Sequence, residues 1–122
     1  AYGTKLGLRM VMAPNGTLIT PETALKMKES GIRRISVSID GATAEFHDSF
    51  RGVPNAYDMA LQGIKSARDA GIEFQINTTI TKDNLDQIPD ILKRSGSSLP
   101  CTSTGTQGVY LIGAVATNFP KL

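Results

Sequence analysis

The amino-acid sequence predicts an α/β fold built on parallel strands. A helical pattern, a glycine and an apolar strand follow one another twice, and the two glycines, Gly31 and Gly71, are 40 positions apart. That spacing suits a parallel sheet, in which each crossover needs a dozen or more residues. The composition, 40% hydrophobic and 20% charged over 122 residues, is typical of one globular domain.

The first unit is expected to be a strand over residues 6–13 followed by a helix over 21–30. The strand is almost continuously apolar, which is typical of a buried parallel strand. Thr20 suits the cap of the helix, and the proline after it fits the first helical position without losing a hydrogen bond. Gly31 supplies the left-handed residue that commonly ends a helix.

The second unit begins with a strand over 32–39, in which Ile35, Val37 and Ile39 alternate with other residues. Residues 42–55 are expected to form a loop, longer than the usual two to six residues of an α/β connection. Loops of that length are usually functional. This one carries His47, Asp48, Arg51 and Gly52.

The third unit comprises a helix over 56–70, ended by Gly71, and a strand over 72–80. A last helix is expected over 85–94. Its proline lies early enough to fall in the first turn, where its missing N–H costs no hydrogen bond. The chain therefore divides into an α/β domain over 1–95 and a Ser/Gly/Thr-rich linker over 96–122. A fourth strand over 109–115 is an open alternative within that linker.

Charge and cysteine content exclude several classes of function. The 13 basic and 11 acidic residues are scattered, so the sequence predicts no nucleic-acid partner and no membrane-surface partner. With neither a membrane-spanning apolar run nor a signal sequence, the expected location is the cytoplasm. A single cysteine, Cys101, can neither form an intramolecular disulfide nor hold a zinc ion or an iron–sulfur cluster alone. It is interpreted as incidental.

Three strand ends carry short polar side chains, at 14–17, 38–41 and 77–79. In parallel α/β sheets, ligands bind where the carboxyl ends of the strands converge. Taken singly, the Asn-Gly and Asp-Gly pairs in these segments are better explained as ordinary turns than as parts of a ligand site. Their coincidence at one end of the sheet favours a ligand site.

Individual side chains near these ends have alternative interpretations. Ser38 either contacts a ligand or fills a tight core layer as a small residue. Arg51 either clamps a carboxylate through two parallel N–H bonds or is a surface residue, free or paired with Asp48. The only histidine, His47, is interpreted as a packing residue. The same packing role is expected of the four methionines, Met10, Met12, Met27 and Met59.

The segments 36–41 (SVSIDG) and 47–52 (HDSFRG) resemble the fourth strand and following loop of radical S-adenosylmethionine (SAM) enzymes. The similarity is closest to haem and haem d1 biosynthesis proteins, peptide-modifying maturases and the molybdenum-cofactor cyclase. Residues 12–18 (MAPNGTL) look like the family's third strand end, with a proline in place of threonine. Residues 74–81 (FQINTTIT) look like the fifth strand.

This resemblance implies a partial TIM-like (β/α) barrel that binds SAM across its mouth. In the family, a 4Fe-4S cluster held by a Cys-x3-Cys-x2-Cys motif cleaves SAM to a 5′-deoxyadenosyl radical. By position in the motifs, Ser38 and Arg51 would contact the SAM carboxylate. Asp40 would support the strand end or the ribose, and Asn15 and Asn77 would line the cofactor site.

The sequence also departs from the family pattern, because it has no Cys-x3-Cys-x2-Cys motif and no Gly-Gly-Glu. We therefore interpret it as the middle of a radical SAM domain, either a truncated gene product or an excised fragment. Its full-length enzyme would modify a tetrapyrrole or a peptide, while the isolated chain would not ligate the cluster and would be inactive. The alternative is a non-catalytic α/β module for ligand binding or interaction.

Self-association of the chain is also expected. Helices on one face of three parallel strands would leave an apolar inner face and two open edges uncovered. Two copies would supply six strand–helix units, the number in the family barrel.

Overall fold

The structure is a computed structural model that describes residues 2–79, 81–94, 110–111 and 114–116. Its sheet has the strand order β1-β2-β3-β5-β4. Three strands are parallel, namely β1 (Met10–Met12), β2 (Ile32–Ser38) and β3 (Glu73–Thr78). The short strands β4 (Tyr110–Leu111) and β5 (Ala114–Ala116) are antiparallel, and β5 pairs with β3. The predicted α/β fold, with the second parallel strand between the other two, is confirmed.

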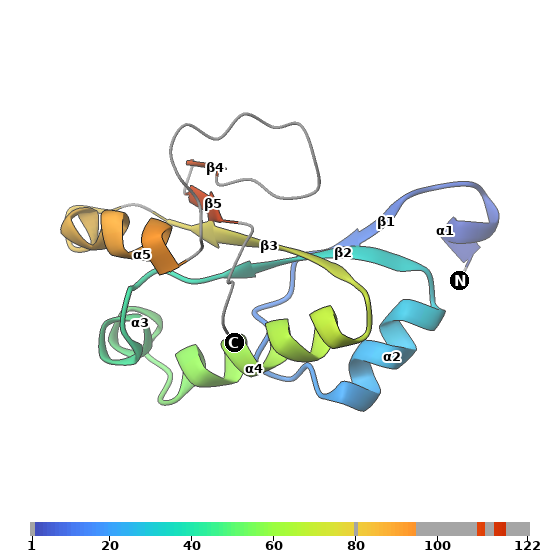
Figure 1. The fold of residues 1–122 in the computed structure, drawn as a ribbon, viewed down its shortest axis with the longest axis horizontal. Helices are drawn as coiled ribbons and strands as arrows, with labels where there is room; N and C mark the ends of the chain where they lie inside the picture. The colour runs from blue at the N-terminus through green and yellow to red at the C-terminus, as the bar shows by residue number, and fades with distance from the viewer. Residues whose placement is uncertain (1, 80, 95–109, 112–113, 117–122) are drawn as a thin grey trace.

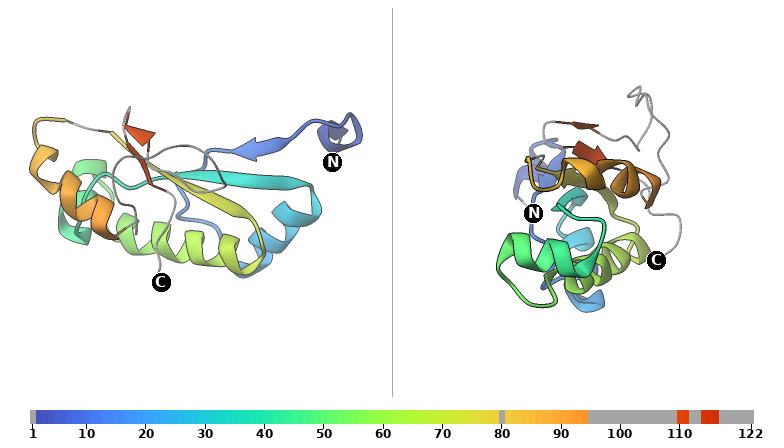
Figure 2. Two further views of the ribbon diagram at one scale, coloured as in Figure 1. Left: turned by 45° about the horizontal axis from the view of Figure 1, so that its top comes forward. Right: turned by 90° about the vertical axis from the view of Figure 1, so that its left-hand side faces the viewer.

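The helices most important for the core are α2 (Pro21–Glu29) and α4 (Ala56–Asp69), which lie along one face of the sheet (Figures 1 and 2). The alternation in β2 explains this packing. Ile35 and Val37 are fully buried and form a core cluster with Ile64 of α4 and Ala24 of α2. The start predicted for α2 and the glycines predicted after α2 and α4 are confirmed. The Thr20 hydroxyl accepts a hydrogen bond from the backbone of α2, and Gly31 and Gly71 follow the two helices with positive φ.

The first strand is shorter and more exposed than predicted. Residues 2–5 form a helix, α1 (Tyr2–Lys5), and β1 begins only at Met10. Val11 and Met12 are 57% and 42% exposed, because β1 pairs with β2 alone among the described residues. The packing role is therefore wrong for Met12, and for Met59 of α4, which is 36% exposed; Met10 and Met27 do pack against the core.

The predicted loop over 42–55 contains a helix, α3 (Ala44–Arg51). The Thr43 hydroxyl caps it by accepting a hydrogen bond from its first turn, and Gly52 ends it with a φ of 66°. Both are ordinary helix-boundary signals, so the element was predictable. The last helical segment starts as a 3-10 turn, η1 (Leu85–Gln87), and continues as α5 (Ile88–Arg94).

Along β2 and β3, the face of the sheet opposite α2 and α4, which we call the open face, carries half-buried polar side chains. Neighbouring residues of β2 and β3 face each other there in three pairs: Arg34 with Glu73, Ser36 with Gln75, and Ser38 with Asn77. The apolar inner face on which the expectation of self-association depended is therefore wrong for these two strands. Self-association itself stays a prediction.

The predictions for the chain beyond α5 concern residues that are mostly outside the described part. In place of one fourth strand over 109–115, the structure has the two short strands β4 and β5, and residues 112–113 between them are not described. The linker over 96–109 and Cys101 also lie outside the described residues. No helix in the described part of the chain is both long and apolar enough to cross a membrane.

Candidate functional site

A small pocket lies at the carboxyl ends of β1 and β2. Its volume is about 140 Å³, and it brings together three of the five predicted site residues, Asn15, Ser38 and Arg51. The other residues that line it are Thr17, His47, Val53 and Ala56. Pockets that enclose a drug-sized ligand usually measure about 300–1,000 Å³. This pocket therefore suits one polar group of a larger ligand.

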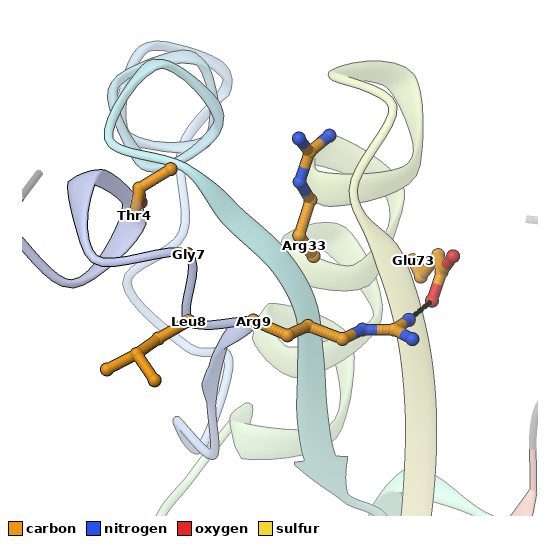
Figure 3. Close-up of a pocket in the computed structure, with 6 residues that line it drawn as sticks. All are labelled: Thr4, Gly7, Leu8, Arg9, Arg33 and Glu73. Atoms are coloured by element: carbon orange, nitrogen blue, oxygen red, sulfur yellow. Dashed lines mark hydrogen bonds and ion pairs between the residues drawn. The ribbon is translucent and has the colours of Figure 1, made fainter.

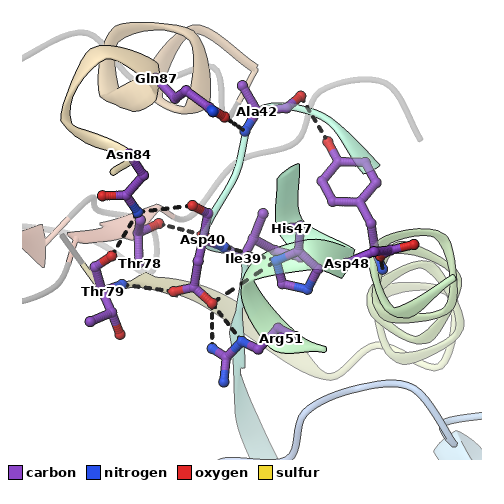
Figure 4. A network of polar contacts seen from close by, with 11 residues as sticks. Ile39, Asp40, Ala42, His47, Asp48, Arg51, Thr78, Thr79, Asn84 and Gln87 are labelled. Carbon is purple, nitrogen blue, oxygen red and sulfur yellow. Dashed lines mark hydrogen bonds and ion pairs between the residues drawn. The ribbon is translucent and has the colours of Figure 1, made fainter. Parts of the chain in front are cut away.

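Asp40 follows β2 and is the centre of the polar network beside this pocket (Figure 4). Its side chain is completely buried, and both of its oxygens accept hydrogen bonds. Oδ2 accepts from Nε of Arg51 at 2.6 Å and is 2.5 Å from Nη2, while Oδ1 accepts from the backbone N–H of Thr79 at 2.8 Å. One carboxylate thus joins the end of β2, the helix α3 and the segment after β3.

Arg51 is therefore paired with Asp40, and the alternative of a salt bridge to Asp48 is wrong. Asp48 is occupied elsewhere, because it accepts hydrogen bonds from the backbone N–H groups of Asn55 and Tyr57 at the start of α4. The Arg51 side chain is 38% exposed. Its recorded bonds use Nε and Nη2, so the N–H groups of Nη1 are available to an acceptor in the pocket.

His47 is buried beneath the network, as the sequence predicted for a packing residue. Its Nδ1 accepts a hydrogen bond from the backbone N–H of Asp40 at 3.0 Å, and its ring lies edge-on to Tyr57 with centroids 5.7 Å apart. Burial lowers the pKa of His47 below its usual value; Arg51 lowers it further, whereas Asp40 and Asp48 oppose the shift. The ring is therefore held neutral, with Nδ1 as the acceptor.

The network depends on Asn84, a residue that the sequence analysis missed. Its completely buried side chain donates through Nδ2 to the carbonyl oxygens of Asp40 and Thr79, at 2.9 and 2.8 Å. Its Oδ1 accepts from the backbone N–H of Thr81 at 2.7 Å. Asn84 lies 44 positions beyond Asp40, so no local sequence signal links the two.

The remaining predicted residues occupy neighbouring positions. Asn77 of β3 is directly opposite Ser38 in the sheet and accepts a hydrogen bond from Gln75 at 3.2 Å. Asn15 accepts hydrogen bonds from the backbone and the hydroxyl of Thr17, at 3.2 and 3.0 Å. These bonds agree with the turn interpretation of the Asn-Gly pair, and they leave the Asn15 amide at the pocket wall.

A parallel sheet with its helices on one face and a polar pocket at its strand ends is the arrangement in which α/β proteins commonly bind ligands. Comparison with protein families matches residues 2–94 to the radical SAM superfamily, and the chain belongs to that superfamily.

Curated relatives agree with this assignment. An AdoMet-dependent heme synthase of Nitratidesulfovibrio vulgaris is 62% identical over 93 residues, which cover 76% of this chain and 25% of the relative. An Fe-coproporphyrin III synthase of Methanosarcina barkeri is 43% identical, covering 75% of this chain and 23% of the relative. A pre-heme d1 synthase of Dinoroseobacter shibae is 35% identical, and the match covers 84% of this chain and 24% of the relative. The chain spans about a quarter of the length of these relatives.

The described residues do not fit the iron–sulfur cluster that the superfamily implies. In the part of the chain that the structure describes, no group of three or more His, Cys, Asp or Glu side chains is placed to hold a metal ion. The one thiol of the sequence belongs to Cys101, outside that part. We therefore derive no chemical step through the cluster. The pocket does fit part of SAM, because its polar side chains can bind a carboxylate or an amine.

Proposed function

We propose that this chain is the part of a radical SAM enzyme that binds the amino-acid end of SAM. The observation that carries the proposal is the pocket that Asn15, Ser38 and Arg51 share at the strand ends. In a complete enzyme, bound SAM would supply the radical chemistry. The residues of this chain would hold and orient the molecule.

Each side chain has a distinct part in this proposal. The Nη1 group of Arg51 and the hydroxyl of Ser38 donate hydrogen bonds to the SAM carboxylate. Asp40 is a positioning residue, because it holds the Arg51 guanidinium through Nε and Nη2 and is itself completely buried. Asn15 and Asn77 offer amide groups on either side of Ser38.

We further propose that the enzyme acts on a tetrapyrrole. Relatives named as an AdoMet-dependent heme synthase, an Fe-coproporphyrin III synthase and a pre-heme d1 synthase support this substrate class. A more distant relative, the mycofactocin maturase MftC of Mycolicibacterium smegmatis, is 32% identical over 111 residues, and peptide modification is accordingly the second candidate.

Calorimetric titration with SAM tests the binding site. We expect weak binding to the parent chain and a loss of about 1.5–3 kcal/mol in Arg51→Ala, the range for a charge-assisted hydrogen bond. Ser38→Ala separates direct contact from support, because it removes one half-buried hydroxyl outside the Asp40 network. Arg68→Ala is the matched control, since Arg68 is also 38% exposed and pairs with Asp69 away from the pocket.

Equal affinity of the parent and Arg51→Ala for SAM would remove Arg51 from the site. The two interpretations of the chain are distinguished by the genomic sequence immediately upstream. A reading frame that supplies a Cys-x3-Cys-x2-Cys motif would support the radical SAM enzyme, whereas a start codon next to Ala1 would favour the non-catalytic module.

We also propose that the chain alone performs no radical chemistry. Four-iron clusters are held by several cysteine thiolates, and the sequence has one. After anaerobic reconstitution with iron and sulfide, SAM and a strong reductant are expected to give no 5′-deoxyadenosine. Formation of that product above a control without protein would contradict the proposal.

A further inference from the structure

A second cluster of charged residues lies at the amino-terminal ends of the strands, far from the proposed SAM pocket. Glu73 of β3 is shared by two arginines: its Oε2 is 2.8 Å from Nη2 of Arg9, and 3.1 and 2.9 Å from Nε and Nη2 of Arg34. Figure 3 shows the Arg9 side chain crossing β2 on the open face to reach Glu73. Arg33 lies beside them.

This cluster carries more positive charge than it neutralises. The guanidinium groups of Arg9 and Arg34 bind the single carboxylate of Glu73, and Arg33 lines the same hollow, so two positive charges are in excess. In the described part of the chain, no ion pair or hydrogen bond of the Arg33 side chain is recorded. The cluster also borders a hollow of about 500 Å³, which is lined by Thr4, Gly7, Leu8, Arg9, Arg33 and Glu73.

A continuous polar row connects the cluster with the SAM pocket along the open face. The pairs Arg34–Glu73, Ser36–Gln75 and Ser38–Asn77 succeed one another along β2 and β3, and all six side chains are half-buried. Arg34 and Ser38 are four positions apart, which corresponds to about 13 Å along a parallel strand. A molecule of that length can contact both ends of the row.

We propose that the cluster of Arg9, Arg33 and Arg34 binds a carboxylate group of a small anionic ligand on the open face. The bonds to Glu73 show that Arg9 and Arg34 already converge on one carboxylate oxygen, and Arg33 and the hollow leave room for a second carboxylate. We take this ligand to be the enzyme's substrate, with its reacting group about 13 Å away at the strand ends. This identification of the ligand rests on the proposed function. Carboxylate binding itself does not, so the two can fail separately.

The test is an NMR titration of the 122-residue chain with tricarballylate, which carries three carboxylates, and with its neutral triamide. Backbone amides and arginine Nε–H groups report the place of binding. We expect saturable shifts at Arg33 and Arg34 with a dissociation constant in the millimolar range, which added salt raises. The triamide is expected to cause no such shifts.

Three variants make the assignment specific. Arg33→Gln and Arg9→Gln are each expected to weaken binding by up to about fivefold, the upper end of the range for an exposed ion pair. Glu73→Gln is expected to strengthen it, because it removes the carboxylate that competes for the same guanidinium groups. Lys82→Gln, at an exposed position after β3, is the matched change of charge and is expected to leave affinity unchanged.

The result for Glu73→Gln separates a binding site from a purely structural ion-pair cluster. A structural cluster would lose stability in this variant without gaining affinity for tricarballylate. The proposal is overturned if neither the parent nor Glu73→Gln binds at about 10 mM probe. It is also overturned if Lys82→Gln weakens binding as much as Arg33→Gln, or if the triamide binds equally well.

Discussion

Replacing Asp40 with asparagine tests whether one buried carboxylate holds the strand-end segments together. The Asp40 carboxylate accepts bonds from Nε and Nη2 of Arg51 on one oxygen and from the N–H of Thr79 on the other. Asparagine has the same shape, but its NH₂ group cannot accept. Either Arg51 or Thr79 therefore faces a donor in Asp40→Asn, whichever way the amide turns.

The expected loss of stability in Asp40→Asn depends on the burial of Asp40 and on the exposure of its partner Arg51. Removing one member of a fully buried ion pair costs about 3–5 kcal/mol, because the other charge remains buried. Arg51 is 38% exposed and can be hydrated, so the loss is smaller than in that case. Hydrogen bonds to charged groups contribute about 1.5–3 kcal/mol. We therefore expect Asp40→Asn to lower the free energy of unfolding by about 2–3 kcal/mol.

Urea unfolding followed by far-ultraviolet circular dichroism measures this loss, provided that the slope against urea stays unchanged. The control is Glu22→Gln, whose side chain is 78% exposed and pairs with Lys26 one helical turn away. Such pairs contribute about 0.3–0.5 kcal/mol. Combining Asp40→Asn with Arg51→Gln should give a coupling energy of at least about 1 kcal/mol. A loss in Asp40→Asn no larger than that in the control would refute the argument.

Three further outcomes are expected. Gly63→Ala should destabilise the chain by about 1–3 kcal/mol in urea unfolding, because a Cβ at Gly63 would overlap the backbone oxygen of Gly16. This loss is expected although alanine favours helices more than glycine does. Unchanged stability would show that the close approach of Gly63 to Gly16 is dispensable. As pH falls below about 6.5, stability should decrease by up to about 1.4 kcal/mol per pH unit, because the lowered pKa of buried His47 lets the unfolded chain bind a proton that the folded chain does not. The decrease should end below the pKa of the folded state, and His47→Gln should abolish it. Light scattering should detect self-association at high micromolar concentration through the exposed edge of β1, and a strict monomer would contradict this.

The elements predicted correctly are those whose signals are local. The alternation in β2, the cap at Thr20 and the glycines after α2 and α4 each act within a few residues, so the sequence displays them directly. The helix α3 was missed, because a connection rich in polar residues was interpreted as a loop. Its two ends are nevertheless marked by Thr43 and Gly52. The length and the burial of β1 were overestimated, because an apolar run predicts burial but does not show which neighbouring element covers the strand.

The candidate site could be predicted only in part, because its bonds join distant segments. The polar strand ends identified Asn15 and Ser38, and the long connection after β2 identified Arg51; the three residues do meet in one pocket. The pairing of Arg51 was not predictable, because Asp48 is nearer in the sequence than Asp40 and is occupied by backbone N–H groups. The bonds of Asn84 to Asp40 depend on how the segments after β2 and β3 pack, which no motif encodes.

One strand supplies both the core and the proposed binding surface. Because side chains alternate along a strand, Ile35 and Val37 of β2 enter the core under α4 while Ser36 and Ser38 face the opposite side. A shift of register by one residue would exchange the two sets, burying the hydroxyls and exposing the aliphatic groups. The apolar contacts that stabilise β2 therefore also fix which polar groups line the open face. Changes to the polar row consequently should alter binding with little effect on stability, except where Arg34 and Glu73 are paired.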